Sequence, residues 1–293
     1  MNLQRDINQN KRNTVFIMAA FIGIVGAIGW LVAYSLGNIS AIYGIVGISL
    51  IFVIVQYFMA DKLALMSTGA KQIQQSDNPR LWTMVQGIAQ QTQMPMPRLY
   101  IVEDSAPNAF ATGRDPSYAV VAATTGILEV MDDRELRAVL AHEMSHVKNY
   151  DIRVSMIAFG LTSVIGAMTN ALSWAFMFGG GQNNQERGPG GMIVGVVLIV
   201  LAPIAAMMIQ MAISRQREYL ADASGASITS DPEGLANALG KLQTYGAPMK
   251  RQDTTTAHLF IANPLKTGAF VQLFSTHPPL EERIRRLKAS AGL

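Results

Sequence analysis

The chain contains no cysteine and few charged residues. Among its 293 residues, 15% are Asp, Glu, Lys or Arg and only four are His. Without cysteine there are no disulfides, thiolate metal sites or cysteine nucleophiles, so any metal site must use nitrogen and oxygen ligands. The formal net charge of +3 is too small to favour nucleic-acid binding, and we expect no nucleic-acid partner. A soluble protein carries about 25% charged residues, so the low charge favours a membrane protein.

Long uncharged segments account for this shortage of charge. No Asp, Glu, Lys or Arg occurs from residue 13 to residue 60. At about 1.5 Å per residue, about 20 helical residues cross the hydrocarbon core, so residues 14–35 and 41–60 predict a transmembrane hairpin. The first segment is too long for a cleaved signal peptide and a second follows directly, which favours an uncleaved anchor. Residues 154–185 and 188–214 predict a second hairpin around a glycine-rich loop.

Positive residues flank these segments on one side. They follow the second and fourth predicted spans, whereas the loop within the first hairpin has none. The positive-inside rule therefore predicts that both termini and the segment between the hairpins are cytoplasmic. We expect a tail and hairpin over 1–60, the first part of a soluble domain over 61–153, the second hairpin over 154–213, and the second part of the domain over 214–293.

The soluble segments predict a mainly α structure with a small β-sheet, an α+β fold. Short strands are expected at 98–102 and 118–122, which are rich in β-branched and aromatic residues. Helices are expected after Asn78, from Asp132 or Asp133 to about Lys148, from about 214, from 231–233, and from 278–279 to the end. Residues 247–276 are mixed in composition and are assigned no element.

The predicted helix that ends near Lys148 contains His142-Glu143-Met144-Ser145-His146, the HExxH pattern of zincins. Residues four apart on a helix share one face, so two imidazoles can bind one tetrahedral zinc ion. Glu143 between them can act as a general base. The alternative is that both histidines are solvent-exposed and bind no metal, but the pattern is too specific to favour that interpretation.

A catalytic zinc ion needs a third protein ligand. A third histidine of the metzincin type is excluded, because Ile152 and Arg153 occupy the positions where it would follow. Glu218 is the better candidate, because two membrane crossings after His146 return the chain to the same side of the bilayer. Asp222 lies four residues further on the same helix face and can accept the spare N–H of a ligating imidazole.

Five motifs occur in the order seen in one known family: residues 108–111, 124–128, 141–151, 214–222 and 276–280. Over nearly its whole length the chain resembles the HtpX-type membrane-bound zinc metalloproteases, relatives of the CAAX prenyl proteases. The resemblance implies a zincin-like catalytic domain that holds one zinc ion per chain, with a glutamate as the third ligand. It implies these ligands and this base: His142, His146 and Glu218 for zinc, and Glu143 for catalysis.

The resemblance also implies a role and a place. It predicts a multi-pass protein of the bacterial plasma membrane whose cytoplasmic catalytic domain cleaves misfolded or membrane proteins in quality control and the stress response. Polypeptides and the lipid bilayer are the expected partners. Residues 247–276 match no motif of the family.

Several residues near the motif have two interpretations. By resemblance, Asn108 and Ala109 lie on the edge that faces an extended substrate, whereas Asn alone is as typical of a turn. His277 can donate to the oxyanion, or it can be a histidine before a proline-initiated helix. Asp151 can support a zinc-binding imidazole, or simply end the helix.

Two other functions compete with this one. An intramembrane metalloprotease carries HExxH inside a span, but the charged residues over 131–137 argue against a span here. A non-catalytic, zinc-dependent scaffold or pore needs only the metal ligands, so the presence of Glu143 argues against it. The sequence therefore favours a zinc metalloendopeptidase.

Overall fold

The computed structural model describes residues 41–155, 215–251, 259–263 and 277–292, with isolated positions between residues 12 and 30. Described residues up to 58 belong to one unit, and residues 59–154 and those after 214 form another. The two spans predicted after residue 153 lie almost entirely outside the described residues, as does most of the first. Within the ranges that the structure describes, no helix combines the length and the apolar character of a membrane span.

Helix α2 covers Ala41–Thr68 and so includes the second predicted span. It starts where that span was expected and continues to Thr68, past the charged residues Asp61 and Lys62. Many of its large apolar side chains are exposed, among them Ile51, Ile54 and Phe58. The helix is therefore not amphipathic: its apolar residues are not confined to one buried face.

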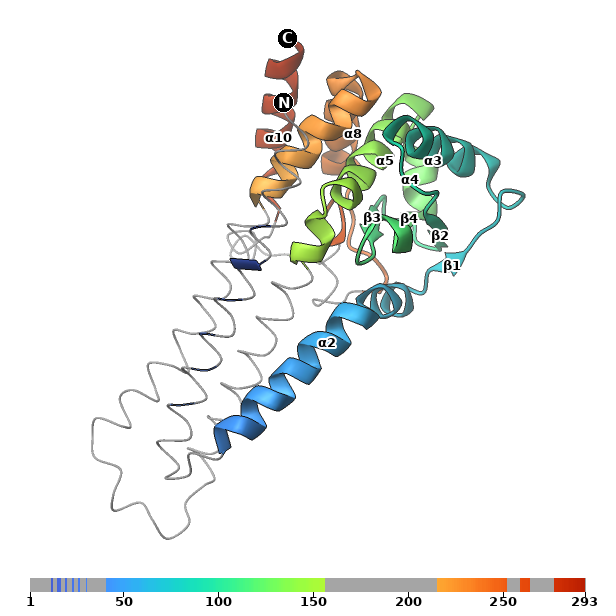
Figure 1. Ribbon diagram of the computed structural model, residues 1–293. Coiled ribbons are helices and arrows are strands. Elements are labelled where there is room, and N and C mark those ends of the chain that lie inside the picture. Colours follow the sequence, from blue (N-terminus) through green and yellow to red (C-terminus); the bar gives the residue numbers. More distant parts are fainter. Residues whose placement is uncertain are drawn as a thin grey trace. The chain divides into compact units, whose positions relative to one another are not determined.

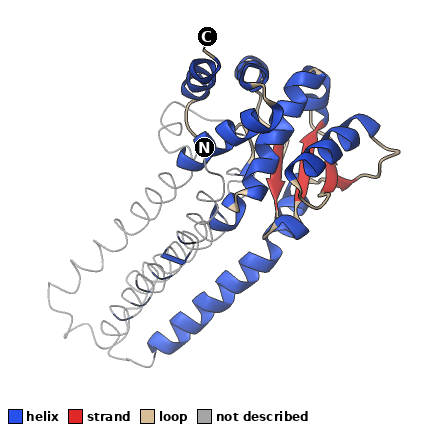
Figure 2. Ribbon diagram, turned by 45° about the horizontal axis from the view of Figure 1, so that its top comes forward, coloured by secondary structure: helices blue, strands red, loops and turns tan. Residues whose placement is uncertain are grey.

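A four-stranded mixed sheet lies at the centre of the second unit (Figure 2). Its strand order is β1-β2-β4-β3, with these bounds: β1 Lys71–Gln72, β2 Arg98–Val102, β3 Ala109–Thr112 and β4 Val120–Thr124. β2 and β4 are parallel, and the other two pairs are antiparallel. The strands predicted at 98–102 and 118–122 are confirmed as β2 and β4. β1 and β3 were not predicted, because β1 has two residues and β3 is Ala-Phe-Ala-Thr.

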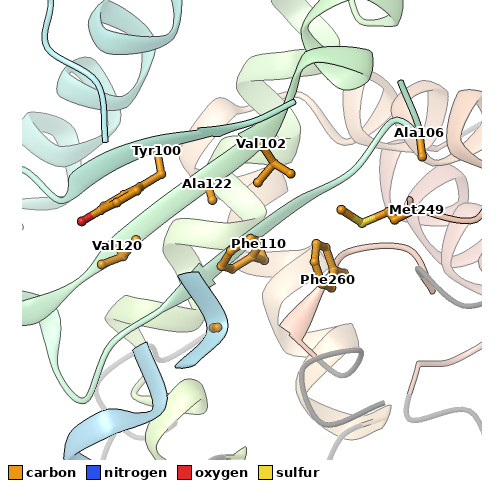
Figure 3. Packing of buried hydrophobic residues seen from close by; sticks show 9 residues of the cluster. Tyr100, Val102, Ala106, Phe110, Val120, Ala122, Met249 and Phe260 are labelled. Atoms are coloured by element: carbon orange, nitrogen blue, oxygen red, sulfur yellow. The ribbon is translucent and has the colours of Figure 1, made fainter. Parts of the chain in front are cut away.

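The two faces of the sheet pack against different partners. One face carries Tyr100, Val102, Phe110 and Val120, which form a buried cluster with residues that include Met249 and Phe260 (Figure 3). Successive side chains of a strand point to opposite faces, so Ala109 and Ala111 of β3 point away from this cluster. Helix α5, Asp133–Lys148, packs against β3 (Figure 1). These small alanines allow the helix to approach the strand closely.

Two of the remaining helices begin where capping residues predict. Asn78 accepts a hydrogen bond from the Leu81 N–H at the start of α3, Pro79–Thr92, and Asp231 accepts one from Gly234 at the start of α8, Pro232–Tyr245. Further elements are α4 Thr125–Val130, the 3-10 helix η1 Pro116–Tyr118, helical residues 215–229, and α10 Leu280–Ala291. α5 packs on α3 and α8, and α8 packs on α10. The predicted α+β class is confirmed for the described residues.

Candidate metal centre

The histidine motif lies on a buried face of α5. Asp132 starts this helix with a capping box, since its side chain accepts from the Glu135 N–H and Glu135 accepts from the Asp132 N–H. Within the helix, His142 is fully buried and His146 is half-buried. Their Nε2 atoms lie 3.2 Å apart, and their ring centroids are 4.8 Å apart. The cap therefore fixes a helix in which both imidazoles converge on one point.

Helical residues 215–229 bring Glu218 to the same point. Its Oε2 lies 3.6 Å from His142 Nε2, and its Oε1 lies 3.5 Å from His146 Nε2. The helix can come this close because residue 225 is glycine. A Cβ at Gly225 would lie 2.9 Å from the backbone N and Cα of His142. One ligand atom from each of the three residues thus fits within 4.8 Å of the others.

Each imidazole presents its other nitrogen to a carboxylate. His142 Nδ1 lies 3.0 Å from Asp222 Oδ1, and His146 Nδ1 lies 3.2 Å from Asp151 Oδ2. A carboxylate that accepts the Nδ1 proton holds the ring in the tautomer whose Nε2 carries a lone pair. The structure therefore places Asp222 beside His142 and Asp151 beside His146, one carboxylate for each histidine.

The geometry of this cluster fits a tetrahedral ion. Zinc–nitrogen and zinc–oxygen bonds of about 2.1 Å at tetrahedral angles separate ligand atoms by about 3.4 Å. The two Nε2 atoms lie 3.2 Å apart, near that value, and each has a different Glu218 oxygen at 3.5 or 3.6 Å; one ligand atom from each residue fits within 4.8 Å of the others. A His-His-Glu set is a donor set typical of a catalytic metal. The residues present therefore fit a metal ion held by His142, His146 and Glu218.

Glu143 lies beside this cluster but has different partners. It is buried, and its Oε2 accepts a hydrogen bond from the Ala111 N–H of edge strand β3 at 2.9 Å. No described residue donates a hydrogen bond to its other oxygen, Oε1. Burial raises the pKa of this carboxyl, and the nearby His142 and His146 only partly oppose that rise. One oxygen is thus held by the sheet, while the other is buried without a hydrogen-bond donor among the described residues.

Arg283 of α10 was missed by the sequence analysis. It is fully buried, and its Nη2 and Nε donate to Asp222 Oδ1 and Oδ2 at 2.7 and 2.9 Å. Its Nη1 lies 3.1 Å from Glu218 Oε2, in an ion pair that lacks hydrogen-bond geometry. Its spacing from Leu287 could have revealed it, because the two residues, four apart, are the buried ones of α10. Its charged neighbours Glu282 and Arg285 instead suggested a solvated face.

His277 also lies beside Glu218. Its Nδ1 is 3.3 Å from Glu218 Oε1, and its side chain is largely buried. The structure therefore brings His277 into the cluster, before the prolines that lead into α10. In its charged form it would stabilise the Glu218 carboxylate.

Opposing charges decide the protonation states at this site. Burial raises the pKa of Glu218, but His277 and Arg283 outweigh it and hold that pKa well below its ordinary value. Burial likewise disfavours the charged form of Asp222, yet Arg283 and His142 lower its pKa to about 2. For His142, burial is again outweighed, by the adjacent carboxylates of Asp222 and Glu218, which raise its pKa to about 9. Buried charges of opposite sign thus stabilise one another at this site.

Asn108 and Ala109 lie at the sheet edge: Asn108 directly precedes β3, and Ala109 is its first residue. Both are buried, and their groups are already used within the chain. Asn108 Nδ2 donates to Ala262 O at 2.8 Å, and the Ile261 N–H donates to Ala109 O at 3.0 Å. Residues from the unassigned 247–276 segment therefore cover both residues.

Comparisons with known proteins agree with this geometry. A family model described as Peptidase family M48 matches residues 75–291. A "Protease HtpX homolog" from Tropheryma whipplei (strain TW08/27) is 50% identical over 284 residues, which cover 96% of each chain. A second, from Ligilactobacillus salivarius (strain UCC118), is 43% identical and covers 98% of this chain and 99% of its own.

The similarity extends to the fold of a solved structure. The crystal structure of S. mikatae Ste24p is 19% identical with a TM-score of 0.55; the match covers 96% of this chain and 66% of the Ste24p chain. It supports a shared fold only. The resemblance to HtpX-type proteases is confirmed by the curated relatives and the matching family model. The chain belongs to peptidase family M48.

Proposed function

We propose that the chain is a membrane-bound zinc metalloendopeptidase. The observation that carries the proposal is the convergence of His142 Nε2, His146 Nε2 and Glu218 within bonding reach of one ion, beside a buried glutamate with a free oxygen. We assign the metal as zinc, one ion per chain, because two imidazoles and one carboxylate form a typical catalytic zinc set. No contact in the described residues favours a non-catalytic scaffold or pore, and Glu143 would have no task in one.

The residues around the ligands each have a proposed task. Asp222 and Asp151 hold the imidazoles of His142 and His146 in the metal-binding tautomer. Arg283 holds the Asp222 carboxylate with two hydrogen bonds and neutralises part of the buried negative charge. To His277, whose Nδ1 lies 3.3 Å from Glu218 Oε1, we assign donation of a hydrogen bond to the oxyanion that develops on the scissile carbonyl.

Bound zinc would supply Lewis-acid polarisation of the scissile carbonyl and increase the acidity of water. Glu143 would take the proton from the attacking water, which its raised pKa favours, and then deliver that proton to the leaving amine nitrogen. The Ala111 N–H holds Oε2 in place, so Oε1 is the oxygen that would exchange the proton. An extended polypeptide would be held at the edge of β3, near Asn108 and Ala109.

We further propose that the active domain acts at the cytoplasmic face of the bacterial plasma membrane on misfolded or membrane proteins. The uncharged segments at 14–35, 41–60, 154–185 and 188–214 support two transmembrane hairpins, one before the first part of the domain and one between its two parts. The exposed apolar side chains of α2 support contact with lipid. The family relationship to HtpX homologues supports the same placement.

The metal assignment is tested by measuring zinc and peptidase activity together. Purified full-length protein in detergent should contain about one zinc ion per chain and cleave unfolded casein, and a chelator should abolish cleavage until zinc is restored. Glu218→Gln should lower the zinc content at least tenfold, the size of effect expected when a metal contact is lost. Glu233→Gln, at an exposed position of α8, is the matched control. Unchanged zinc content in Glu218→Gln would refute the ligand set.

The topology is tested with single cysteines, because the chain has none of its own. Cysteines in the loop over 179–191 should react with a membrane-impermeant thiol reagent from outside the cell. A cysteine at an exposed site of the active domain, such as Glu233, should react only from inside. Labelling of both from the same side would contradict two complete hairpins.

A further inference from the structure

Residues 259–263, called the strap below, lie along the outer edge of β3. Phe260 forms an antiparallel β-bridge with Phe110. Among the described residues it is the one β-bridge outside the named strands. The Phe260 ring packs edge-on against the Phe110 ring, with centroids 4.9 Å apart, and Met249 lies beside them (Figure 3). The strap therefore adds to the sheet at the edge where an extended peptide would bind.

Each backbone contact of the strap uses a group that a bound peptide would need. The Ile261 N–H donates to Ala109 O at 3.0 Å. The Asn108 side chain makes two contacts with the next residue: Nδ2 donates to Ala262 O at 2.8 Å, and Oδ1 accepts from the Ala262 N–H at 3.3 Å. Main-chain hydrogen bonds of this kind hold peptides of many sequences at a sheet edge.

The strap also contacts Arg283, which lies at the metal centre. Arg283 Nη1 donates to Ile261 O at 3.4 Å, and the same guanidinium holds Asp222 and pairs with Glu218. Along the edge of β3, the next outward N–H belongs to Ala111, which donates to Glu143. Two residues of a strand span about 7 Å, so the Ile261 backbone lies one dipeptide from the general base.

We propose that the strap is an internal pseudosubstrate, which occupies the edge of β3 and is displaced when a polypeptide binds. This inference rests on the proposed peptidase function and deepens it. Phe260, buried in the apolar cluster, anchors the strap, while Ile261 and Ala262 are the part that gives way. Because Ile261 is also buried, the incoming chain should place an apolar residue there. The substrate class is thus an extended, unfolded segment with apolar side chains, which a folded protein does not offer.

Hydrogen exchange on the uncleaving variant tests this displacement. Full-length Glu143→Gln with zinc, in detergent, is compared with and without saturating unfolded casein. The amides of 259–263 should exchange at least about tenfold faster when casein is bound, because the Ile261 N–H loses its acceptor, whereas α8 amides should not change. If casein binds and the strap amides exchange at the same or a slower rate, the strap is a fixed part of the sheet and the proposal is wrong.

Kinetics provide a second measurement. Ile261→Pro removes the N–H that donates to Ala109, so the strap should compete less well and the KM for casein should fall about fivefold at unchanged kcat. Ile261→Val keeps the N–H and should leave KM unchanged. A higher KM in a folded Ile261→Pro protein would overturn the proposal. If the proline variant does not fold, the exchange experiment on the intact strap decides.

The outcomes separate this inference from the function on which it rests. Zinc-dependent cleavage of casein by the parent, without displacement of the strap, would overturn the pseudosubstrate and leave the peptidase intact. Failure of the zinc-loaded parent to cleave casein would instead overturn the proposed function and the pseudosubstrate with it.

Discussion

The first turn of α5 and its C-terminal half each bury a glutamate, and the two glutamates have opposite surroundings. Glu135 accepts from the Asp132 N–H at 3.0 Å and lies 2.6 Å from Lys241 Nζ, so its carboxylate closes a capping box and an ion pair. Glu143 has a single hydrogen bond, from the Ala111 N–H, and a buried oxygen without a donor among the described residues. Residue type and helix are the same, but the partners differ.

This difference indicates how to separate structural from reactive carboxylates in one element. A buried carboxylate that accepts from a cap N–H and pairs with a cation contributes to stability. One that is left incompletely bonded costs stability, and such a cost is typical of functional sites. Substitution of Glu135 should therefore lower stability and leave activity unchanged, whereas substitution of Glu143 should lower activity and leave stability unchanged.

The largest expected effect is the loss of activity in Glu143→Gln. A general base contributes about 10²–10⁴-fold to the rate, so kcat for casein should fall by about that factor. Gln can still accept from the Ala111 N–H, so the free energy of unfolding should stay within about 0.5 kcal/mol of the parent. Initial rates and chemical denaturation measure both. Retained activity with normal zinc content would refute the assigned base.

The next effect concerns Arg283, the cation that pairs with the carboxylates at the metal centre. Arg283→Met leaves the buried carboxylates of Asp222 and Glu218 without their guanidinium, which should destabilise the fold by about 3–5 kcal/mol. Arg283→Lys keeps the charge but loses the fork geometry, and should lie between Met and the parent. Denaturation in detergent measures the order. Equal stability of all three would mean that the carboxylates do not depend on this cation.

A smaller effect tests the approach of the second helix to α5. Gly225→Ala places a methyl group 2.9 Å from His142 backbone atoms, so the helices must separate, at a cost of about 1–3 kcal/mol. Zinc affinity should fall as Glu218 moves away. The matched control is Gly240→Ala in α8, where a Cβ meets nothing within 4 Å and should stabilise by about 0.5–1 kcal/mol. Isothermal titration with zinc and thermal unfolding compare the two; equal zinc affinity would contradict the close crossing.

The smallest effect is expected at the structural glutamate. Glu135→Ala removes the side chain that accepts the Asp132 N–H, and losing one half of a capping box costs about 1 kcal/mol. Glu135→Gln keeps an acceptor and should be closer to the parent. Both variants should keep full zinc content and kcat, as casein assays would show. A large loss of kcat in Glu135→Gln would remove the distinction between the two glutamates.

Parts of the site followed from the sequence because their signals are local. Asp132 and the apolar spacing that follows it predict α5, and HExxH on that helix predicts two converging imidazoles. Asn108 and Ala109 were expected at a sheet edge from resemblance alone, although β3 lacks the β-branched pattern that identifies strands. Arg283 was missed because its charged neighbours are exposed, so composition suggested a solvated helix.

The sequence by itself determined where α3, α5 and α8 begin, which residues are chemically able to bind a metal, and which segments lack charge. These properties depend on a few neighbouring residues, through caps, periodicity and side-chain chemistry. Only the tertiary structure decided that Glu218 meets His142 and His146, that Arg283 neutralises their surroundings, and that Ile261 covers the edge beside Glu143. Those contacts join residues far apart in the chain, and packing of whole helices on the sheet brings them together.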